Sequence, residues 1–405
     1  MKCVLVGLSG YAGKYIRFME ALGPESLQSL AAVVDPYASK APQYPQMLQR
    51  GIPVFDTLSD CFRHVQADLV IISSPIAFHK EQILESIAHG ACVLCEKPLV
   101  PLWQDAVDLA NILGDDLRKL GVGFQWSFSK CMQQLKHRIL SGEFGSPVLM
   151  KAHISWQRPS SYYTHSSWHG RVRGDAQEWI LDSILTNATA HYLHNIFFLL
   201  GETMTTSALP VEIQGNVYRA KPIESYDTCF LKGSFANGAS FFFTASHGAD
   251  RNSDPQFEYI FEKAVISFNE NLSPFVHLRH SDGRREICGE PQSLLEEAEK
   301  LRWMMYSASD GSLPACTLET IAPHLLVCNT IYDRVPVQHF PESMHILQVD
   351  PPSLWICGLS DAMEQCYAQA KLPDELGYPW AASAVSIDFR QLKQTTCYQW
   401  LLRNV

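Results

Sequence analysis

A lysine follows the end of an apolar run in the stretch "CVLCEKPLVP", where Glu96, Lys97 and Pro98 come directly after residues 92–95. In parallel α/β sheets ligands bind beyond the carboxyl ends of the strands, so Lys97 stands where it can meet a bound molecule. A cation beside a hydroxyl group stabilises a developing alkoxide while a neighbouring base removes the proton, which is the proton chemistry of alcohol oxidation. The alternative is a surface lysine that pairs with Glu96, because most lysines are exposed.

A glycine-rich turn lies near the N-terminus, in "VGLSGYAGKY". The commoner GxGxxG spacing would be met only as Gly7, Ser9 and Ala12, but the turn follows an apolar strand and opens a helical pattern. Gly7 allows a tight turn, Gly10 lets the backbone approach a diphosphate, and Gly13 lets the helix pack on the sheet. The turn predicts a dinucleotide site, and the alternative is a turn that binds nothing.

An acid ends the second apolar strand, "LAAVV", at Asp35. A carboxylate at this place accepts hydrogen bonds from the ribose hydroxyls and repels a 2′-phosphate, so NAD is favoured over NADP. Lys40 lies close enough in the sequence to leave NADP open.

Strands alternate with helical patterns over the first domain, residues 1–125, which predicts a doubly wound, mostly parallel Rossmann sheet of the α/β class. Its expected strands are 3–6, 30–34, 69–72, 92–95 and 122–124, and Pro101 is expected to begin a helix. The second domain, residues 126–335, has short β-rich runs separated by turn signals, and predicts an α+β domain with a large, open, mostly antiparallel sheet. Helices are expected there at 188–200, 293–308 and 317–334. Residues 336–405 form a C-terminal extension whose role the sequence does not reveal.

The composition is that of a folded globular protein, with 46% hydrophobic and 18% charged residues among 405. The formal net charge of −10 opposes nucleic-acid binding. Apolar runs fall short of the roughly 18 residues that span a bilayer.

Twelve cysteines are scattered along the chain, and we expect reduced thiols. The N-terminal residues lack the pattern of a secretory signal, so we expect a cytoplasmic protein. Cys92 and Cys95 form a CxxC, but they point to opposite faces of a strand, so we expect neither a redox pair nor a zinc site.

The run "AFHKEQILESIAHGACVLCEKPL", with the order of elements over about residues 1–330, resembles the Gfo/Idh/MocA oxidoreductase family, which carries a Glu-Lys-Pro at this place. The resemblance implies nicotinamide-dependent redox chemistry on sugars, polyols or related ring compounds, with Lys97 facing the nicotinamide. We therefore expect NAD, with NADP as the alternative, to be bound by Gly7, Ser9, Gly10, Tyr11, Ala12, Gly13, Asp35, Ser73, Ser74, Pro75, His79, Glu96, Lys97 and Gln125.

The family's second motif is an acidic residue followed four positions later by a histidine. In "LDSILTNATAHYLHN" the histidine is His191, but Asn187 fills the acidic position and Thr189 replaces the usual glycine. An asparagine orients an imidazole or binds a substrate hydroxyl, but it cannot stabilise an imidazolium as a carboxylate would. Asp182 could supply that charge in space. The resemblance thus implies Lys97 and His191 as the proton-handling pair, with Asn187 as orienter, unless His191 is a histidine of the core.

His191 and His194 lie three positions apart on one helical face and could share a metal, with His165 and His169 nearby in the sequence. A third convergent ligand is not evident, so we expect no metal.

The segment "YYTHSSWHGRVRGD" is rich in groups that stack on and hydrogen-bond to sugar rings. We expect Trp168 and Arg171 to bind substrate, together with Lys97, Asn187 and His191. The alternative is an ordinary surface loop.

The sequence thus predicts an NAD(P)-dependent oxidoreductase that acts on a secondary hydroxyl or ketone of a sugar, cyclitol or polyol. One alternative is a glycosidase or lyase that retains NAD, and another is a non-catalytic dinucleotide-binding homologue, which the Asn187 departure allows. We expect a small-molecule substrate, no nucleic-acid or membrane partner, and a homodimer or homotetramer in which a second subunit covers the open sheet.

Overall fold

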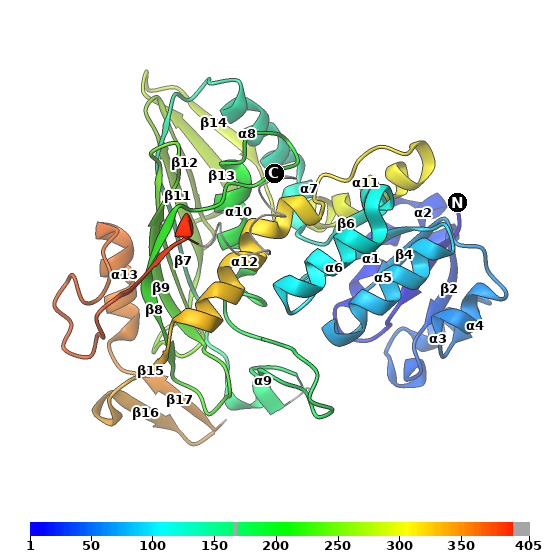
Figure 1. The fold of residues 1–405 in the computed structure, drawn as a ribbon, viewed down its shortest axis with the longest axis horizontal. Helices are drawn as coiled ribbons and strands as arrows, with labels where there is room; N and C mark the ends of the chain where they lie inside the picture. The colour runs from blue at the N-terminus through cyan, green and yellow to red at the C-terminus, as the bar shows by residue number, and fades with distance from the viewer. Residues whose placement is uncertain (165–167, 351, 392–405) are drawn as a thin grey trace. The chain divides into compact units, whose positions relative to one another are not determined.

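The computed structural model describes residues 1–164, 168–350 and 352–391 (Figure 1). The chain folds into two compact units. Unit 1 comprises Met1–Gln133 and Pro291–Ile321, and unit 2 comprises Gln134–Glu290 and the described residues from Ala322 onward. Unit 1 is therefore built from two separate stretches of sequence, which corrects the predicted division at residues 125 and 335.

Unit 1 contains a 6-stranded parallel sheet in the order β3-β2-β1-β4-β5-β6, which confirms the Rossmann prediction. Its strands are β1 (Cys3–Val6), β2 (Leu30–Val34), β3 (Val54–Phe55), β4 (Leu69–Ile72), β5 (Cys92–Cys95) and β6 (Leu120–Val122). Its helices are α1 (Ala12–Leu22), α2 (Pro24–Gln28), α3 (Tyr44–Gln49), α4 (Leu58–Phe62), α5 (His79–Ala88), α6 (Trp103–Leu113), α7 (Gln125–Phe128) and α11 (Leu294–Asp310). The strand order reverses between β1 and β4, and ligands of such sheets bind outside the carboxyl ends of the strands at this point.

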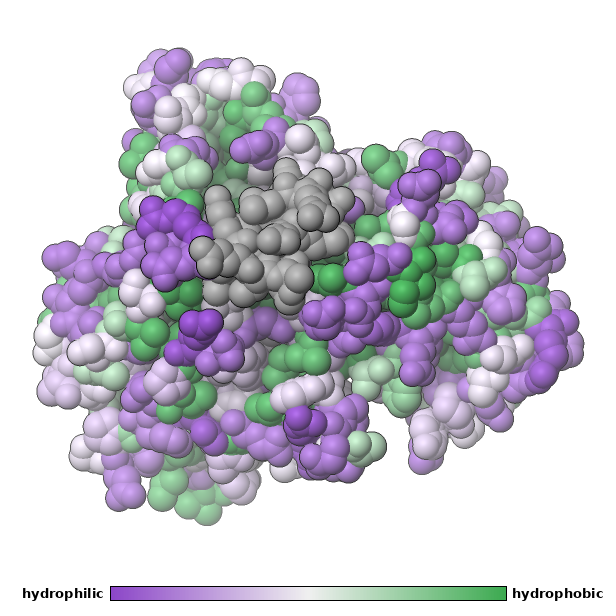
Figure 2. Space-filling model, viewed as in Figure 1, coloured by the Kyte–Doolittle hydropathy of each residue, from purple (hydrophilic) through white to green (hydrophobic). Residues whose placement is uncertain are grey.

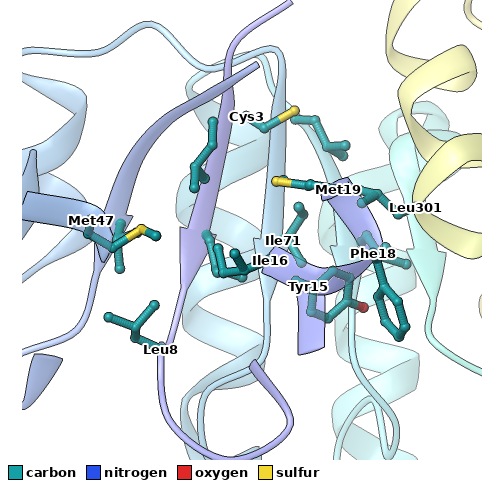
Figure 3. Close-up of a cluster of buried hydrophobic side chains, with 14 of the residues drawn as sticks. Cys3, Leu8, Tyr15, Ile16, Phe18, Met19, Met47, Ile71 and Leu301 are labelled. Carbon is teal, nitrogen blue, oxygen red and sulfur yellow. The ribbon is translucent and has the colours of Figure 1, made fainter. Parts of the chain in front are cut away.

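Helix α11 completes the core of unit 1, although the first stretch of unit 2, Gln134–Glu290, separates it from the rest of unit 1 in the sequence. Figure 3 shows Leu301 of α11 beside Phe18 and Met19 of α1, and all three side chains are buried. The strands of the parallel sheet are apolar on both faces because helices cover both. The predicted helix 293–308 thus exists, but it belongs to unit 1.

Unit 2 contains a 10-stranded, mostly antiparallel sheet in the order β14-β13-β12-β11-β7-β10-β9-β8-β15, with β18 paired to β8, as predicted in class. Its strands are β7 (Pro147–Ser155), β8 (Glu212–Arg219), β9 (Thr228–Ser234), β10 (Ser240–Ser246), β11 (Ser253–Phe261), β12 (Ala264–Asn269), β13 (Ser273–His280), β14 (Arg285–Gly289), β15 (Val337–His339) and β18 (Val385–Asp388). Its helices are α9 (Ser160–Thr164), α10 (Ala190–Leu199) and α13 (Leu359–Gln369), and a hairpin joins β16 (His345–Gln348) to β17 (Ser353–Ile356). Helices α8 (Lys130–Leu140) and α12 (Leu318–Arg334) include the residues at which the two units divide.

The C-terminal extension is part of the sheet domain. Its β15 and β18 extend the sheet at β8, and α13 packs on β7 and β10, on the face opposite α10 (Figure 1). Phe340, Ile356 and Met363 of the extension are buried against Phe230 and Phe242 of the sheet. The extension therefore covers this part of the sheet face, and the second subunit that we expected on the open sheet stays a prediction.

Two element boundaries differ from the sequence prediction. Strand β6 ends at Val122, since the chain turns into α7 from Phe124 onward. Helix α6 begins at Trp103 after an extended Leu102, so Pro101 lies outside the helix. Strands β13 and β14 were missed because few of their residues are buried and their alternation of apolar residues is weak.

On the face shown in Figure 2, apolar side chains are scattered among polar ones in most places, as on an ordinary protein surface. Among the helices of the described residues, none has both the length and the apolar composition needed to cross a membrane. The cysteines of the described part of the chain are free thiols.

Candidate functional site

The glycine turn of unit 1 connects β1 to α1, at the point where the strand order reverses. Gly7 has a φ of 92°, and a Cβ there would stand 2.8 Å from the carbonyl oxygen of Ser73. Gly10 has a φ of 60°, and among the described residues nothing lies within 4 Å of the place its Cβ would take. Both positions need glycine for their backbone conformation. Gly10 also leaves space in which a diphosphate can approach the backbone.

Gly13 leaves room for the side chain of Gln43, with which a Cβ at this position would collide. Its predicted part in packing the helix on the sheet stays a prediction. Asp35 holds the turn, because its carboxylate accepts the backbone N–H of Leu8 at 2.9 Å and that of Tyr37 at 2.8 Å. Each carboxylate oxygen accepts more than one hydrogen bond, so Asp35 retains capacity for ribose hydroxyls.

His79 is a structural tie between two loops at the carboxyl edge of the sheet. It is buried, with Nε2 2.9 Å from the carbonyl oxygen of Ser74 and Nδ1 3.1 Å from those of Pro98 and Leu99. Burial lowers its pKa, which favours the neutral ring. His79 thus positions the loop of Ser73, Ser74 and Pro75 against the segment that carries Lys97, and the cofactor contact expected of it stays a prediction.

The Glu96 side chain is buried, and its contact with cofactor stays a prediction. Its carboxylate forms an ion pair with Lys300, whose side chain is 0% exposed, and accepts a hydrogen bond from Tyr15 Oη at 2.6 Å. The backbone N–H of Lys97 donates to Glu96 Oε2 at 3.2 Å. The ion-pair partner of Glu96 is thus Lys300, and the buried carboxylate fixes the backbone from which Lys97 projects.

Lys300 connects this buried carboxylate to the glycine turn. Its Nζ donates to Tyr11 Oη at 3.0 Å, and Tyr11 Oη donates to Gln125 Oε1 at 3.1 Å. Burial raises the pKa of Tyr11 and of Tyr15 well above the usual range, and the charge of Glu96 raises both further. The predicted residues Tyr11 and Gln125 therefore lie together, bridged to the first residue of the Glu-Lys-Pro motif by a lysine that the sequence analysis missed.

In unit 2, Asn187 lies in the turn before α10 and His191 is the second residue of that helix. Thr189, which replaces the family's glycine, is buried, and its hydroxyl donates to the carbonyl oxygen of Ile184 at 2.5 Å. Thr189 thus uses its side chain to hold the turn that presents Asn187. Both Asn187 and His191 are partly exposed.

A narrow pocket in unit 2 is lined by Asn187 and also by Asp182, as the sequence allowed. Its volume is about 10 Å³, which is the space that a single water molecule needs. Asp182 Oδ2 accepts the backbone N–H of Gly170 at 2.5 Å. His191 is not among the residues that line this pocket.

Three further residues that the sequence analysis did not select line the same pocket: Tyr162 and Tyr163 of α9, and His247, which follows β10. Tyr163 Oη lies 3.0 Å from His247 Nδ1. Burial raises the pKa of Tyr162 to about 12, although hydrogen bonds with Asn187 and Arg158 lower it. The only sequence signal for His247 was its place directly after a strongly apolar strand.

In the loop predicted to bind substrate, Trp168 and Arg171 contact other residues of the same loop. Arg171 Nη1 pairs with Asp175 at 2.5 Å, and the Trp168 ring lies 3.9 Å from that of His169. His165 lies outside the described residues. A substrate-binding role for Trp168 and Arg171 stays a prediction.

His194 is a core residue. Its ring is buried, 6.1 Å from that of Phe198 and 6.0 Å from that of His324, and burial holds its pKa well below the usual range. Within the described ranges, no group of three or more His, Cys, Asp or Glu residues is arranged to hold a metal ion.

Two family models match the chain. The model described as an oxidoreductase family with an NAD-binding Rossmann fold matches residues 1–124, and the model of the Gfo/Idh/MocA C-terminal domain matches residues 132–267. The chain belongs to the Gfo/Idh/MocA family.

Curated relatives in this family include inositol 2-dehydrogenases. That of Streptomyces avermitilis is 29% identical over 201 residues, which cover 46% of this chain and 58% of the relative. That of Rubrobacter xylanophilus is 27% identical over 203 residues, which cover 49% of this chain and 52% of the relative. The chain therefore spans about half the length of the curated relatives it matches.

Solved structures of oxidoreductases share the fold. An oxidoreductase from Agrobacterium radiobacter, solved with NAD+, L-tartaric acid and magnesium, superposes with a TM-score of 0.66 at 15% identity, covering 82% of this chain and 95% of that one. The aldose-aldose oxidoreductase from Caulobacter crescentus gives a TM-score of 0.66 at 17% identity, with 82% and 96% covered.

Proposed function

We propose that this chain is an NAD-dependent oxidoreductase that transfers hydride between nicotinamide and a secondary hydroxyl or ketone of a polyol, cyclitol or sugar. The observation that carries the proposal is the glycine turn of unit 1, whose open Gly10 lies at the strand-order reversal of a parallel sheet that also presents Lys97 at a carboxyl end. The family description and the names of the inositol 2-dehydrogenase relatives support it.

The residues of unit 1 fit a dinucleotide. Backbone at Gly10 and the start of α1 would take the diphosphate, and Asp35 would accept the ribose hydroxyls. NAD supplies the hydride acceptor when bound. Asp35 favours NAD over NADP because its charge repels a 2′-phosphate.

The proton chemistry falls to Lys97 and His191. In oxidation, the Lys97 ammonium stabilises the alkoxide that forms as the substrate hydroxyl loses its proton, and His191 accepts that proton. Asn187 orients the substrate or the imidazole, and Asp182, which lines the same pocket as Asn187, supplies a carboxylate that Asn187 lacks. These roles continue the resemblance of the Glu-Lys-Pro and Asn187–His191 segments to the family motifs.

Two alternatives share the dinucleotide site. A glycosidase or lyase that retains NAD would oxidise its substrate transiently and release no NADH. A non-catalytic homologue would bind the dinucleotide without turnover, and the amide at position 187 is the observation that favours it. The homodimer or homotetramer and the cytoplasmic location also stay predictions.

The test is a fluorescence titration of the protein with NADH and NADPH, followed by a panel of polyols and sugars read at the nicotinamide absorbance. Lys97→Ala should abolish turnover and leave NADH binding nearly unchanged. Lys119→Ala is the matched control, because Lys119 directly precedes β6 and lies at the amino edge of the same sheet. Binding without NADH release would favour the alternatives, and failure to bind either dinucleotide would refute the proposal.

A further inference from the structure

The pocket in unit 2 contains a buried histidine that the proposed proton chemistry does not use. His247 is 4% exposed, and one ring nitrogen, Nδ1, lies 3.0 Å from Tyr163 Oη. Among the described residues, the other nitrogen, Nε2, is buried with no hydrogen-bond partner. Leaving a buried polar nitrogen without a hydrogen-bond partner destabilises a fold, so such an atom points to a missing ligand.

The surroundings keep this histidine neutral. Burial lowers its pKa well below the usual range, and the charges of Arg158, Lys221 and His169 lower it further. Burial also raises the pKa of Tyr163 well above the usual range, so its phenol keeps its proton. A neutral imidazole has one N–H and one lone pair, and the hydrogen bond with Tyr163 decides which of them Nε2 carries.

The size and charge of the pocket limit what it can receive. Its volume of about 10 Å³ admits one water-sized group, and not a ring. Asp182 is the one acidic residue among those described as lining it, and none of them is lysine or arginine. The charges of Arg158 and Lys221 act on His247 from outside the lining, whereas the Asp182 carboxylate within the lining repels an anionic group and accepts a hydrogen bond from a neutral one.

We infer that this pocket recognises a single hydroxyl group of an uncharged polyol, with His247 and Tyr163 as its hydrogen-bonding pair. A hydroxyl is both donor and acceptor, so it satisfies Nε2 in either tautomer of His247 and bonds to Asp182 or Asn187 as well. The inference rests on the proposed oxidoreductase function for the presence of a polyol, but it concerns recognition and not the reacting hydroxyl. It makes His247 a specificity-determining residue.

The experiment compares wild type, His247→Gln and Tyr163→Phe. Binding of myo-inositol, D-glucose, sorbitol and D-glucuronate to the NADH-loaded protein is measured by calorimetry, and kcat and KM are measured with NAD. The polyol with the highest affinity is then tested against its monodeoxy analogues. His153→Gln is the matched control, because His153 is also buried, lies on neighbouring β7, and is not among the residues that line the pocket.

We expect wild type to bind a neutral polyol better than D-glucuronate, and to lose about ten-fold or more in affinity for one monodeoxy analogue. His247→Gln and Tyr163→Phe should raise KM more than they lower kcat and should remove the discrimination against that analogue, whereas His153→Gln should keep it. Melting temperatures of all variants separate loss of recognition from loss of folding.

Two results would overturn the inference. If His247→Gln and Tyr163→Phe still discriminate against the deoxy analogue, another part of the protein binds the hydroxyl group. That result would leave the oxidoreductase proposal intact. A wild-type protein that binds none of the neutral polyols would also overturn it. Binding that depends on His247 without NADH formation would instead support the pocket and refute the dehydrogenase.

Discussion

Lys300 and Glu96 form an ion pair inside unit 1, although 204 positions separate them in the sequence. Glu96 begins the Glu-Lys-Pro motif, and Lys300 lies on α11, which follows the first stretch of unit 2, Gln134–Glu290, in the sequence. The pair is enclosed by the rings of Tyr11, Tyr15 and Phe18, over which the Lys300 ammonium lies at 4.6, 5.1 and 5.6 Å. The returning helix therefore supplies the charge that lets a carboxylate remain buried beneath the glycine turn.

Lys300→Met should destabilise unit 1 by about 3–5 kcal/mol, because it leaves Glu96 buried without its counter-charge. Chemical denaturation followed by tryptophan fluorescence measures the loss. Lys14→Met is the control, since Lys14 forms its ion pair with Glu297 while 43% exposed, and should cost less than about 1 kcal/mol. The double variant Glu96→Gln, Lys300→Met should recover part of the loss; equal stabilities of the single and double variants would contradict a coupled pair.

Gly10→Ala should weaken NADH binding by roughly ten-fold or more, because a methyl group would fill the space proposed for the diphosphate. Gly51→Ala is the matched control in the same unit. Its φ of 67° is close to the 60° of Gly10, and the described residues leave both Cβ positions open, so the two variants should lose similar stability. The dissociation constants of NADH for both variants are measured by titration. Equal dissociation constants would mean that the diphosphate does not bind at Gly10.

The sequence predicts much of unit 1 because its signals are local. Four of its strands are short apolar runs that end at Val6, Val34, Ile72 and Cys95, and the structure reproduces each of these ends. The partner of Glu96 could not be predicted, because Lys300 occurs in an amphipathic helix that a sequence pattern cannot assign to one unit or the other. The sequence analysis also missed His247, because its contact with Tyr163 forms only when the sheet folds.

Asp35→Asn should shift the cofactor preference toward NADPH. Asparagine keeps one oxygen, which accepts the Leu8 N–H, but its NH2 group cannot accept the Tyr37 N–H, so the turn loses one of its two hydrogen bonds. The substitution also removes the charge that repels a 2′-phosphate. The ratio of the NADPH and NADH dissociation constants should fall by about ten-fold relative to wild type. The melting temperature of the variant serves as the control for the turn. An unchanged ratio with intact folding would mean that Asp35 only holds the loop.

His153 should make the stability of unit 2 depend on pH. Burial lowers its pKa from 6.5 to about 4, and among the described residues its ring nitrogens have no hydrogen-bond partner. Between pH 6.5 and about 4, His153 is protonated in the unfolded chain but neutral in the folded protein. The stability from His153 is therefore complete above pH 6.5 and is lost as the pH falls toward 4, by on the order of 2–3 kcal/mol. Denaturation of wild type and His153→Gln at pH 7.5, 5.5 and 4.5 checks this: the free energies of unfolding should converge as the pH falls, and a constant difference between the two proteins would show that His153 does not titrate in this range.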